Sequence, residues 1–514
     1  MKKKLVIIIL VFAVFIGTFI VYKCSKTKEN ITDIDDVSTN VSGEELSPVN
    51  LTFYMYGEEK QDTKEVLNKV AKASNLNINL NFEWFDNSNY NKKVVTAINS
   101  NEMFDGFLCG KPELEGMDLL QFYRKGRIKD LSKLLPQYAP RILEQLSKQE
   151  LDACRLDGNI VMIPQLYPMV NWLSVYLRED LADKYKISSI NTFDEYENLL
   201  KMLKENEKDI IPGIITDGQN YNLNFMAKAF GYVVVDYNLF LVYKWDDPEM
   251  KIIPWEQTPE FKESTDIISR WFKNGYTVEI KGNEKNIGSF IALGSNIYEN
   301  SVGIDLMKNG DSSVYKNFIL YKDKPNQRYT PLEYYPRDAI AFNSSSTNVE
   351  RALMFLNWIQ SDQENYDLFM YGIKGKHYNL ENNKLTNPKG IESTKNPYKG
   401  WDNNAFLNVK FDRTATELEL PDTYSSDLLN FVNKYAKYAP HNGFYPDYSG
   451  IVNIVNKRAT IYADKVIAPF SRCTYNTANT EIIISDLKNA GSQLLVDEVQ
   501  KQLNKWKVNN KKNK

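Results

Sequence analysis

The chain has few of the residues on which disulfide scaffolds and zinc sites depend. Only four of its 514 residues are cysteine and none form a C-x-x-C pair, so a framework of several disulfides is excluded. With two histidines, a zinc site built on several imidazoles is excluded as well. Cys109 and Cys154 leave two alternatives, one disulfide or two buried free thiols, and we expect the free thiols.

Catalytic signatures and an excess of basic residues are missing too. The sequence contains no G-x-S-x-G, H-E-x-x-H or P-loop pattern, and we expect no cofactor and no metal. Acidic residues number 66, so a suitable pair of carboxylates is no sign of glycoside hydrolysis. Beyond residue 30 the chain holds 57 basic and 65 acidic residues, a net charge of about −8. That balance argues against a nucleic-acid partner.

The chain does carry an export segment at its start. Three lysines at positions 2–4 precede an uncharged apolar run over 5–21, which is typical of an export signal. The run has 17 residues, at the border between a cleaved signal and a spanning helix. Cys24 follows it where a lipid would be attached, but Tyr22 and Lys23 replace the small residues of lipoprotein signals. We expect an uncleaved anchor or a divergent lipoprotein signal.

A polar stretch separates this segment from a globular body. Residues 25–49 contain no aromatic residue, which predicts a flexible linker. Strands are predicted over 51–57, 77–84 and 104–109. Helices between them begin at a capping-box pattern from Asp62 to Glu65 and at Tyr90. Strands that alternate with helices predict an α/β lobe with an open sheet.

The alternation continues toward the C-terminus. A further strand is predicted over 160–164, and helices are predicted after Thr192, after Thr258 and after Thr347. A last helix is predicted over 482–507, with one apolar stripe in its core-facing side: Leu487, Leu494, Val499, Leu503 and Trp506. Because 514 residues exceed the size of a single hydrophobic core, we expect two lobes.

Several segments, in their order and spacing, resemble one protein family. The most specific is Tyr371-Gly-Ile-Lys-Gly-Lys-His-Tyr378, which is similar to a Y-G-I-x-G-x-H-Y run. The others lie at 51–57, 82–90, 104–105, 126–131, 138–140, 157–164, 177–181 and 339–344. On these residues the chain resembles the extracellular solute-binding proteins of bacterial ABC importers, family 1, in the large lipoprotein-type branch with an extended C-terminal domain.

The resemblance implies a two-lobed, periplasmic-binding-protein-like (type II) α/β fold, with hinge segments and an interlobe ligand cleft. By analogy, 50–165 with 316–372 form the first lobe, and 166–315 with 373–510 form the second lobe and C-terminal extension. It implies a receptor rather than an enzyme. The receptor would be a monomer tethered outside the cell, and it would capture an oligosaccharide or other carbohydrate for ABC permease subunits.

Candidate ligand contacts follow from positions in the predicted sheet. Ligands bind open α/β sheets beyond the carboxyl ends of strands. Aromatic rings can cover the C–H face of a sugar, and carboxylates can accept hydrogen bonds from its hydroxyls. The candidates are Tyr56 and Glu58 after the first strand, Trp84 after the second, and Asp105 near the third. Each has a structural alternative, namely core packing, a solvated charge or a turn cap.

Crossing segments and loops supply the remaining candidates. Those near the predicted crossings are Tyr167, Asn171, Trp172, Tyr335 and Arg337, and those in loops rich in Gly, Pro and Asn are Trp401, Tyr445 and Asp447. His377 lies within the family run, where we expect a hydrogen-bonded structural histidine rather than a base.

Two other functions stay open on the sequence alone. The protein could be a sensor that presents its solute to a membrane signalling partner, a hypothesis that gene neighbourhood would test. It could also be an extracellular glycosidase that uses two carboxylates, which turnover of a bound sugar would reveal.

Overall fold

The computed structural model describes residues 46–86, 89–109, 118–168, 172–215, 226–236, 238–278, 286–294, 302–305, 312–320, 338–392, 395–399, 404–413, 422–435, 438–472 and 474–512. The chain divides into two units, Met1–Ser47 and Pro48–Lys514. The predicted export segment, with Cys24, therefore lies outside the described residues. Among the helices that are described, none is long and apolar enough to cross a membrane.

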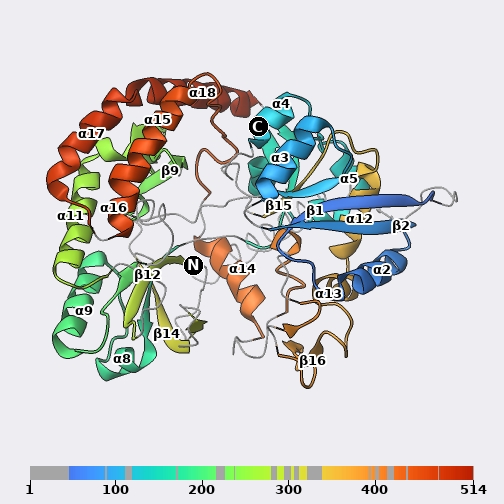
Figure 1. The fold of residues 1–514 in the computed structure, drawn as a ribbon, viewed down its shortest axis with the longest axis horizontal. Helices are drawn as coiled ribbons and strands as arrows, with labels where there is room; N and C mark the ends of the chain where they lie inside the picture. The colour runs from blue at the N-terminus through green and yellow to red at the C-terminus, as the bar shows by residue number, and fades with distance from the viewer. Residues whose placement is uncertain are drawn as a thin grey trace, which may run out of the picture. The chain divides into compact units, whose positions relative to one another are not determined.

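The first lobe contains a five-stranded sheet in the order β2-β1-β3-β15-β6 (Figure 1). Its strands are β1 (Val49–Tyr56), β2 (Ile78–Phe85), β3 (Gly106–Cys109), β6 (Met162–Pro164) and β15 (Ala339–Phe342). β1 runs parallel to β2 and β3, whereas β15 runs antiparallel to both of its neighbours. β15, which comes last of these strands in the sequence, therefore lies inside the sheet between β3 and β6.

Aromatic residues pack both faces of this sheet. On one face, Phe53 contacts Phe355 of α12 (Val349–Ile359) at a ring distance of 6.0 Å, and Phe82 contacts Phe369 of α13 (Gln363–Tyr371) at 6.2 Å. On the other face, Tyr54 stacks on Phe104 at 4.2 Å. Two further helices flank this sheet, α2 (Thr63–Ser74) beside β2 and α3 (Tyr90–Ser100) beside β1.

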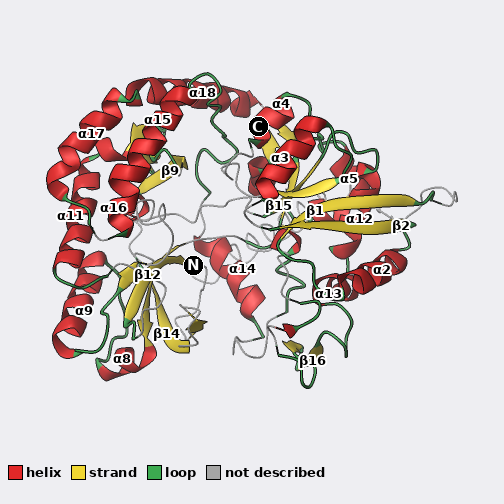
Figure 2. Cartoon of the chain, in the orientation of Figure 1, coloured by secondary structure: helices red, strands yellow, loops and turns green. Residues whose placement is uncertain are grey.

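The second lobe contains another five-stranded sheet, in the order β13-β14-β7-β12-β8. Its strands are β7 (Trp172–Arg178), β8 (Ile214–Ile215), β12 (Ser289–Gly294), β13 (Val302–Asp305) and β14 (Ser312–Ile319). Alternate residues of β7 (Leu173, Val175 and Leu177) are buried against α9 (Phe193–Asn206) and α11 (Pro259–Lys273), which cover one face of the sheet (Figure 2).

A small sheet and the C-terminal helices form a second core beside it. The strands are β9 (Tyr232–Asp236), β10 (Leu241–Lys244) and β11 (Ile253–Pro254). The helices are α15 (Val452–Tyr462), α16 (Ala468–Ser471), α17 (Thr480–Asn489) and α18 (Ser492–Lys512). Arg458 and Glu256 form a fully buried ion pair here, with an Nη1–Oε1 distance of 2.8 Å.

Shorter elements connect these layers. They are α4 (Leu119–Arg124), α5 (Leu134–Tyr138), α6 (Pro140–Leu143), α7 (Lys148–Ala153), β4 (Arg155–Leu156), β5 (Asn159–Ile160), α8 (Glu179–Lys184), η1 (Trp255–Gln257), β16 (Asn379–Glu381), β17 (Lys384–Thr386), η3 (Asn404–Phe406), α14 (Tyr424–Tyr435), the π-helix η5 (Ala463–Ile467) and η6 (Thr477–Asn479).

Two of the predicted helix caps form and two do not. Thr192 accepts a hydrogen bond from the backbone N–H of Glu195, and Thr258 accepts one from Phe261, each at 3.2 Å. The N-cap of α12 is Asn348 rather than Thr347. The predicted capping box at Asp62 is also wrong, because the Asp62 carboxylate accepts from His377 and Lys376 instead of capping α2.

The predicted last helix is in fact two helices. The chain bends between α17 and α18 at Gly491, whose φ of +105° favours glycine. The bend shifts the helical phase, so Leu494 is 60% exposed and Leu495 is fully buried. Leu494 was therefore wrongly placed in the predicted apolar stripe, whereas Leu487, Val499 and Leu503 are buried as expected.

The boundary between the lobes differs from the expectation at two places. β14 reaches Ile319 within the second sheet, beyond the expected start of the first lobe's later part at residue 316. Two residues that were expected in the second lobe, His377 and Phe406, pack on the first. His377 contacts Asp62 there, and Phe406 lies 6.5 Å from Phe82.

The family run and the cysteines have the structural roles that were expected. His377 is fully buried, its Nδ1 accepts from the backbone N–H of Ile373 at 2.8 Å, and its Nε2 lies 3.0 Å from Oδ2 of Asp62. Because both ring nitrogens are engaged, His377 is a structural histidine. Cys109 and Cys154 are buried free thiols, so the predicted absence of a disulfide between them is confirmed.

Candidate functional site

Five strand ends lie at the carboxyl edge of the first sheet. β1 ends at Tyr56, opposite Phe85, the last residue of β2. Because β15 is antiparallel, its first residue, Ala339, lies between Cys109 and Pro164, the last residues of β3 and β6. Loops that follow such strand ends converge, and open α/β sheets bind their ligands at this edge.

Three polar residues connect the strand ends there. The hydroxyl of Tyr56 donates to Oδ1 of Asp338 at 3.2 Å, and the backbone N–H of Gln165 donates to the carbonyl of Asp338 at 3.2 Å. Asp338 has a φ of +56°, a conformation that short polar residues tolerate better than most. We call Tyr56, Gln165 and Asp338 the edge cluster. It brings together residues that are far apart in the sequence.

A rigid aromatic wall supports the edge cluster. Tyr90 packs edge-on against Tyr56 at a ring distance of 5.4 Å. The Tyr90 hydroxyl donates to the carbonyl of Leu108 at 2.7 Å and lies 3.1 Å from the carbonyl of Tyr54. Burial raises the pKa of Tyr90 well above its usual value, so it stays neutral. Burial and the nearby Asp338 also raise the pKa of Cys109, which keeps that thiol unreactive.

The chemistry of the edge cluster suits a neutral, hydroxylated ligand. A phenol and a carboxylate meet there, Gln165 joins them through its backbone N–H, and none of the three residues carries a positive charge. A carboxylate accepts strong hydrogen bonds from hydroxyl groups, and the half-buried ring of Tyr56 offers an apolar face.

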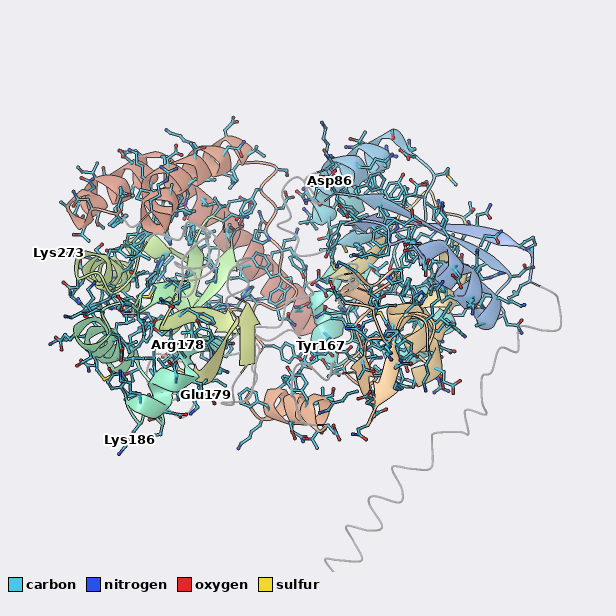
Figure 3. All side chains as sticks on the ribbon, turned by 60° about the horizontal axis from the view of Figure 1, so that its bottom comes forward. Asp86, Tyr167, Arg178, Glu179, Lys186 and Lys273 are labelled. Atoms are coloured by element: carbon cyan, nitrogen blue, oxygen red, sulfur yellow. The ribbon has the colours of Figure 1, made fainter. Side chains whose placement is uncertain are left out.

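Tyr167 lies where the chain leaves the first sheet (Figure 3). The residue before it, Leu166, is held on both sides. Its N–H donates to the carbonyl of Leu407 at 2.7 Å, and its carbonyl accepts from Val409 at 2.9 Å. Tyr167 itself packs against a cluster formed by the end of β14, α14 and the segment after η3: Ile319, Val409, Leu428 and Val432. Burial, as the main cause, raises the pKa of Tyr167. The first crossing is therefore anchored up to this residue.

Residues 57–366 match the model of the bacterial extracellular solute-binding protein family, which is more than half of the chain. The chain belongs to this family. Its members bind solutes and are not enzymes, so the glycosidase hypothesis is set aside. The mixed α/β architecture of the two sheets agrees with this membership.

Relatives of this solute-binding protein are found at low sequence identity. A carbohydrate ABC transporter substrate-binding protein of Streptococcus pneumoniae serotype 4 is 21% identical over 407 residues, which are 74% of this chain and 78% of that protein. The crystal structure of the N-glycan transport solute-binding protein NgtS from Streptococcus pneumoniae gives a TM-score of 0.70 at 17% identity, over 89% of this chain and 99% of that one. FusA of S. pneumoniae, in complex with kestose, gives 0.57 at 16%, over 90% and 100%.

Two other strand-end candidates of the solute-binding protein lie apart from the edge cluster. Glu58 is exposed beyond Gly57, whose φ is +102°. Trp84 is half-buried on the opposite face of the sheet, 6.4 Å from Phe82. The reason is strand alternation: Phe85 packs on Tyr54, so the residue before it faces the other way. Asp86, labelled in Figure 3, accepts from the backbone N–H and side chain of Asn89.

Asp105 lies at the amino end of β3, away from the edge where Tyr56 lies. It is 5% exposed and accepts from the backbone N–H of Thr52 at 2.7 Å and from Oγ of Ser346 at 2.5 Å. These bonds tie the loop before α12 to the sheet. The contacts of Asp105 therefore serve the fold, and we leave it out of the proposed ligand site.

Several candidates fall outside what the structure describes. Asn171, Tyr335, Arg337 and Trp401 are not among the described residues. Trp172 opens β7 and pairs with Gly294, and only its backbone is described. For these five residues the ligand role stays a prediction.

Tyr445 and Asp447 belong to a segment that holds two helices together. The Tyr445 hydroxyl donates to the carbonyl of Ala153, and the Asp447 carboxylate accepts from Arg124 and Gln121 of α4. The backbone of Asp447 exchanges two hydrogen bonds with the amide of Gln502 on α18, at 2.8 and 2.7 Å. A polar cavity of about 600 Å³ lies beside them. The contacts seen for both candidates are with protein groups.

The sequence-based site missed Gln165 and Asp338. Gln165 directly follows a predicted strand, so the strand-end rule could have found it, but the aromatic residues after it were preferred. Asp338 begins an antiparallel strand and reaches the carboxyl edge only for that reason. The sequence does not reveal a strand's direction, so no local signal marked Asp338.

Proposed function

We propose that this solute-binding protein captures an oligosaccharide outside the cell and delivers it to the permease subunits of an ABC importer. Family membership supports the binding role. The edge cluster is the observation that favours a carbohydrate, because its phenol and carboxylate match the hydroxyl groups of a sugar. The names of the relatives, which mention carbohydrate, N-glycan and kestose, point to the same class.

The proposed ligand contacts start from the edge cluster and extend along the first crossing. Tyr56 would cover a sugar face and Glu58 would accept from a hydroxyl at the rim. The predicted contacts outside the described side chains complete the proposal: Asn171, Trp172, Tyr335, Arg337 and Trp401. A ligand held by residues of both lobes would favour the closed form of the protein, because those contacts form together only when the lobes meet.

A ligand screen on residues 48–514 tests the proposal. The probes are Man5GlcNAc, kestose, a peptide of similar mass and a polyol, read by thermal shift and calorimetry. A glycan at one hundred times its Kd should raise the free energy of unfolding by about 2.7 kcal/mol. No saturable response to any glycan at millimolar concentration would refute a carbohydrate ligand.

A pair of tyrosine variants makes the screen specific to the edge cluster. Tyr56→Phe removes the hydroxyl that reaches Asp338, so glycan affinity should fall several-fold. Tyr123→Phe is the matched control. The hydroxyl of Tyr123, on α4, accepts a hydrogen bond from Nδ2 of Asn159, on β5, at 2.6 Å. Equal affinities of the two variants would place the ligand away from Tyr56.

We further propose that the N-terminal segment tethers the receptor, as a monomer, to the outer face of the membrane. The anchor would be the apolar run over 5–21 or a lipid on Cys24. Intact mass analysis of the mature protein distinguishes the two: an uncleaved helix keeps residues 1–23, and a lipid adds acyl mass to a chain that starts at Cys24. A chain released into the medium without either would refute the tether, and light scattering of residues 48–514 tests the monomer.

A further inference from the structure

Gln165 contains a buried acceptor that no described residue uses. The side chain is 2% exposed, and its Nε2 donates to the carbonyl of Tyr167 at 3.2 Å. Its Oε1 finds no hydrogen-bond partner within the described structure. The amide orientation is fixed by that one bond, because a carbonyl oxygen must face the NH₂ group. The oxygen is therefore the unsatisfied atom.

A second buried glutamine shows how the chain usually treats this group. Gln360 is 6% exposed, its Nε2 donates to the carbonyl of Phe406 at 2.8 Å, and its Oε1 accepts from Asn408 at 2.9 Å. Nearly all buried polar atoms in proteins are paired in this way. An acceptor without a partner lowers stability, so it calls for a functional explanation.

The position of Gln165 suggests what its oxygen accepts from. Gln165 belongs to the edge cluster, and its backbone N–H is bound to Asp338, whose carboxylate accepts from Tyr56. The next residue, Leu166, is fixed through both its N–H and its carbonyl. These bonds hold the backbone of both residues in place. No residue that the structure describes donates to Oε1, and the place of Gln165 in the edge cluster favours a ligand as the donor.

We infer that Oε1 of Gln165 accepts a hydrogen bond from a hydroxyl or acetamido N–H of the bound glycan. Gln165 is then a specificity-determining residue, which selects a neutral donor at this subsite and discriminates against a ligand with an acceptor there. This inference rests on the proposed carbohydrate function. The alternative donor is an ordered water molecule, which also satisfies buried polar groups.

The test compares Gln165→Met with Gln360→Met in the protein of residues 48–514, with Man5GlcNAc and kestose as probes. Methionine keeps the size of the side chain and removes the amide. One hydrogen bond of ordinary strength corresponds to about tenfold in affinity. We expect Gln165→Met to bind the glycan about tenfold more weakly than wild type while its Tm without glycan changes little. We expect Gln360→Met to lose Tm and keep its affinity.

A third variant, Gln165→Glu, provides the test if Gln165→Met does not fold. In Gln165→Glu, burial next to Asp338 should raise the pKa of the introduced carboxyl. In its protonated form the O–H replaces the NH₂ donor and the C=O replaces Oε1. Its affinity should approach that of wild type as the pH is lowered, which Gln165→Met cannot reproduce.

The outcomes separate the two proposals. If wild type binds neither glycan nor any other in the panel, the carbohydrate function fails. If wild type binds a glycan and Gln165→Met binds it with an affinity within twofold of Gln360→Met, the role of Gln165 is refuted and its oxygen is served by water. If Gln165→Met does not fold, an affinity of Gln165→Glu that is independent of pH refutes the role.

Discussion

Replacing Gly372 with alanine is expected to destabilise the first lobe far more than the same change at Gly375. Both glycines lie in the family run and both have positive φ, +87° and +84°. A Cβ at Gly372 would lie 2.5 Å from Nδ1 of His377 and 2.7 Å from Cδ1 of Tyr398. A Cβ at Gly375 would meet no atom of the described structure within 4 Å. Gly372 also has a ψ of −143°, so the two variants differ in collision and in backbone strain together.

The magnitudes follow from the contacts of His377. Alanine in a left-handed conformation costs about 1–2 kcal/mol, which is the whole expected effect of Gly375→Ala. At Gly372 the imidazole must also move, which breaks its bonds with the Ile373 N–H and the Asp62 carboxylate. Leaving buried partners unsatisfied costs about 1–3 kcal/mol for each bond. The expected loss for Gly372→Ala is about 3–8 kcal/mol.

Urea unfolding followed by tryptophan fluorescence measures both variants, with the change in midpoint multiplied by a common slope. Removing the imidazole should relieve the collision. The double variant Gly372→Ala/His377→Ala should therefore lose less stability than the sum of its single changes. Losses for Gly372→Ala and Gly375→Ala that agree within about 1 kcal/mol would contradict the packing of His377 described above.

Three further perturbations test other parts of the structure. Arg458→Met leaves Glu256 as an unpaired buried charge and should lower the free energy of unfolding in urea by about 3–5 kcal/mol. A second change in the same chain, Glu256→Gln, should restore much of that loss. A loss below about 1 kcal/mol would contradict the burial of the pair. Leu495→Ala should cost about 2–5 kcal/mol and Leu494→Ala less than about 0.5, and similar losses would contradict the bend before α18. Hydrogen bonds from Lys376 and His377 lower the pKa of Asp62, so its contribution to stability is present above about pH 4 and is lost as the pH falls through its folded-state pKa. Asp62→Asn should therefore reduce the loss of stability at acid pH. An unchanged pH dependence would contradict this assignment.

The elements that could be predicted are those with a local signal. α9 and α11 have an apolar period of a helix and a threonine whose oxygen caps the first turn, so they were expected where they occur. Asp62 has the same local pattern, but a partner 315 residues away takes its carboxylate. The bend at Gly491 did have a signal, the glycine itself, which the apolar stripe outweighed in the prediction. Local patterns fail where a distant residue competes for the same group.

The candidate site shows the same division. Tyr56 was expected at the carboxyl edge because it ends the first predicted strand, and the structure brings it to the edge cluster. Trp84 was expected there as well, but the alternation of β2 turns it to the opposite face. Tertiary packing decides which face of a strand points toward a helix. The residues next to Trp84 in the sequence do not indicate that face. Of the predicted contacts, the variants proposed above test Tyr56, and the ligand role of the others stays a prediction.

The place of β15 has a consequence for how the protein is made. This strand lies between β3 and β6, so the first sheet stays open until roughly two thirds of the chain has left the ribosome. At about 5–20 residues per second, the interval between β3 and β15 lasts about 10–50 seconds. During that time the N-terminal half cannot complete its core. A chain that crosses a membrane in the unfolded state benefits from this delay, because translocation can begin before the first lobe has folded.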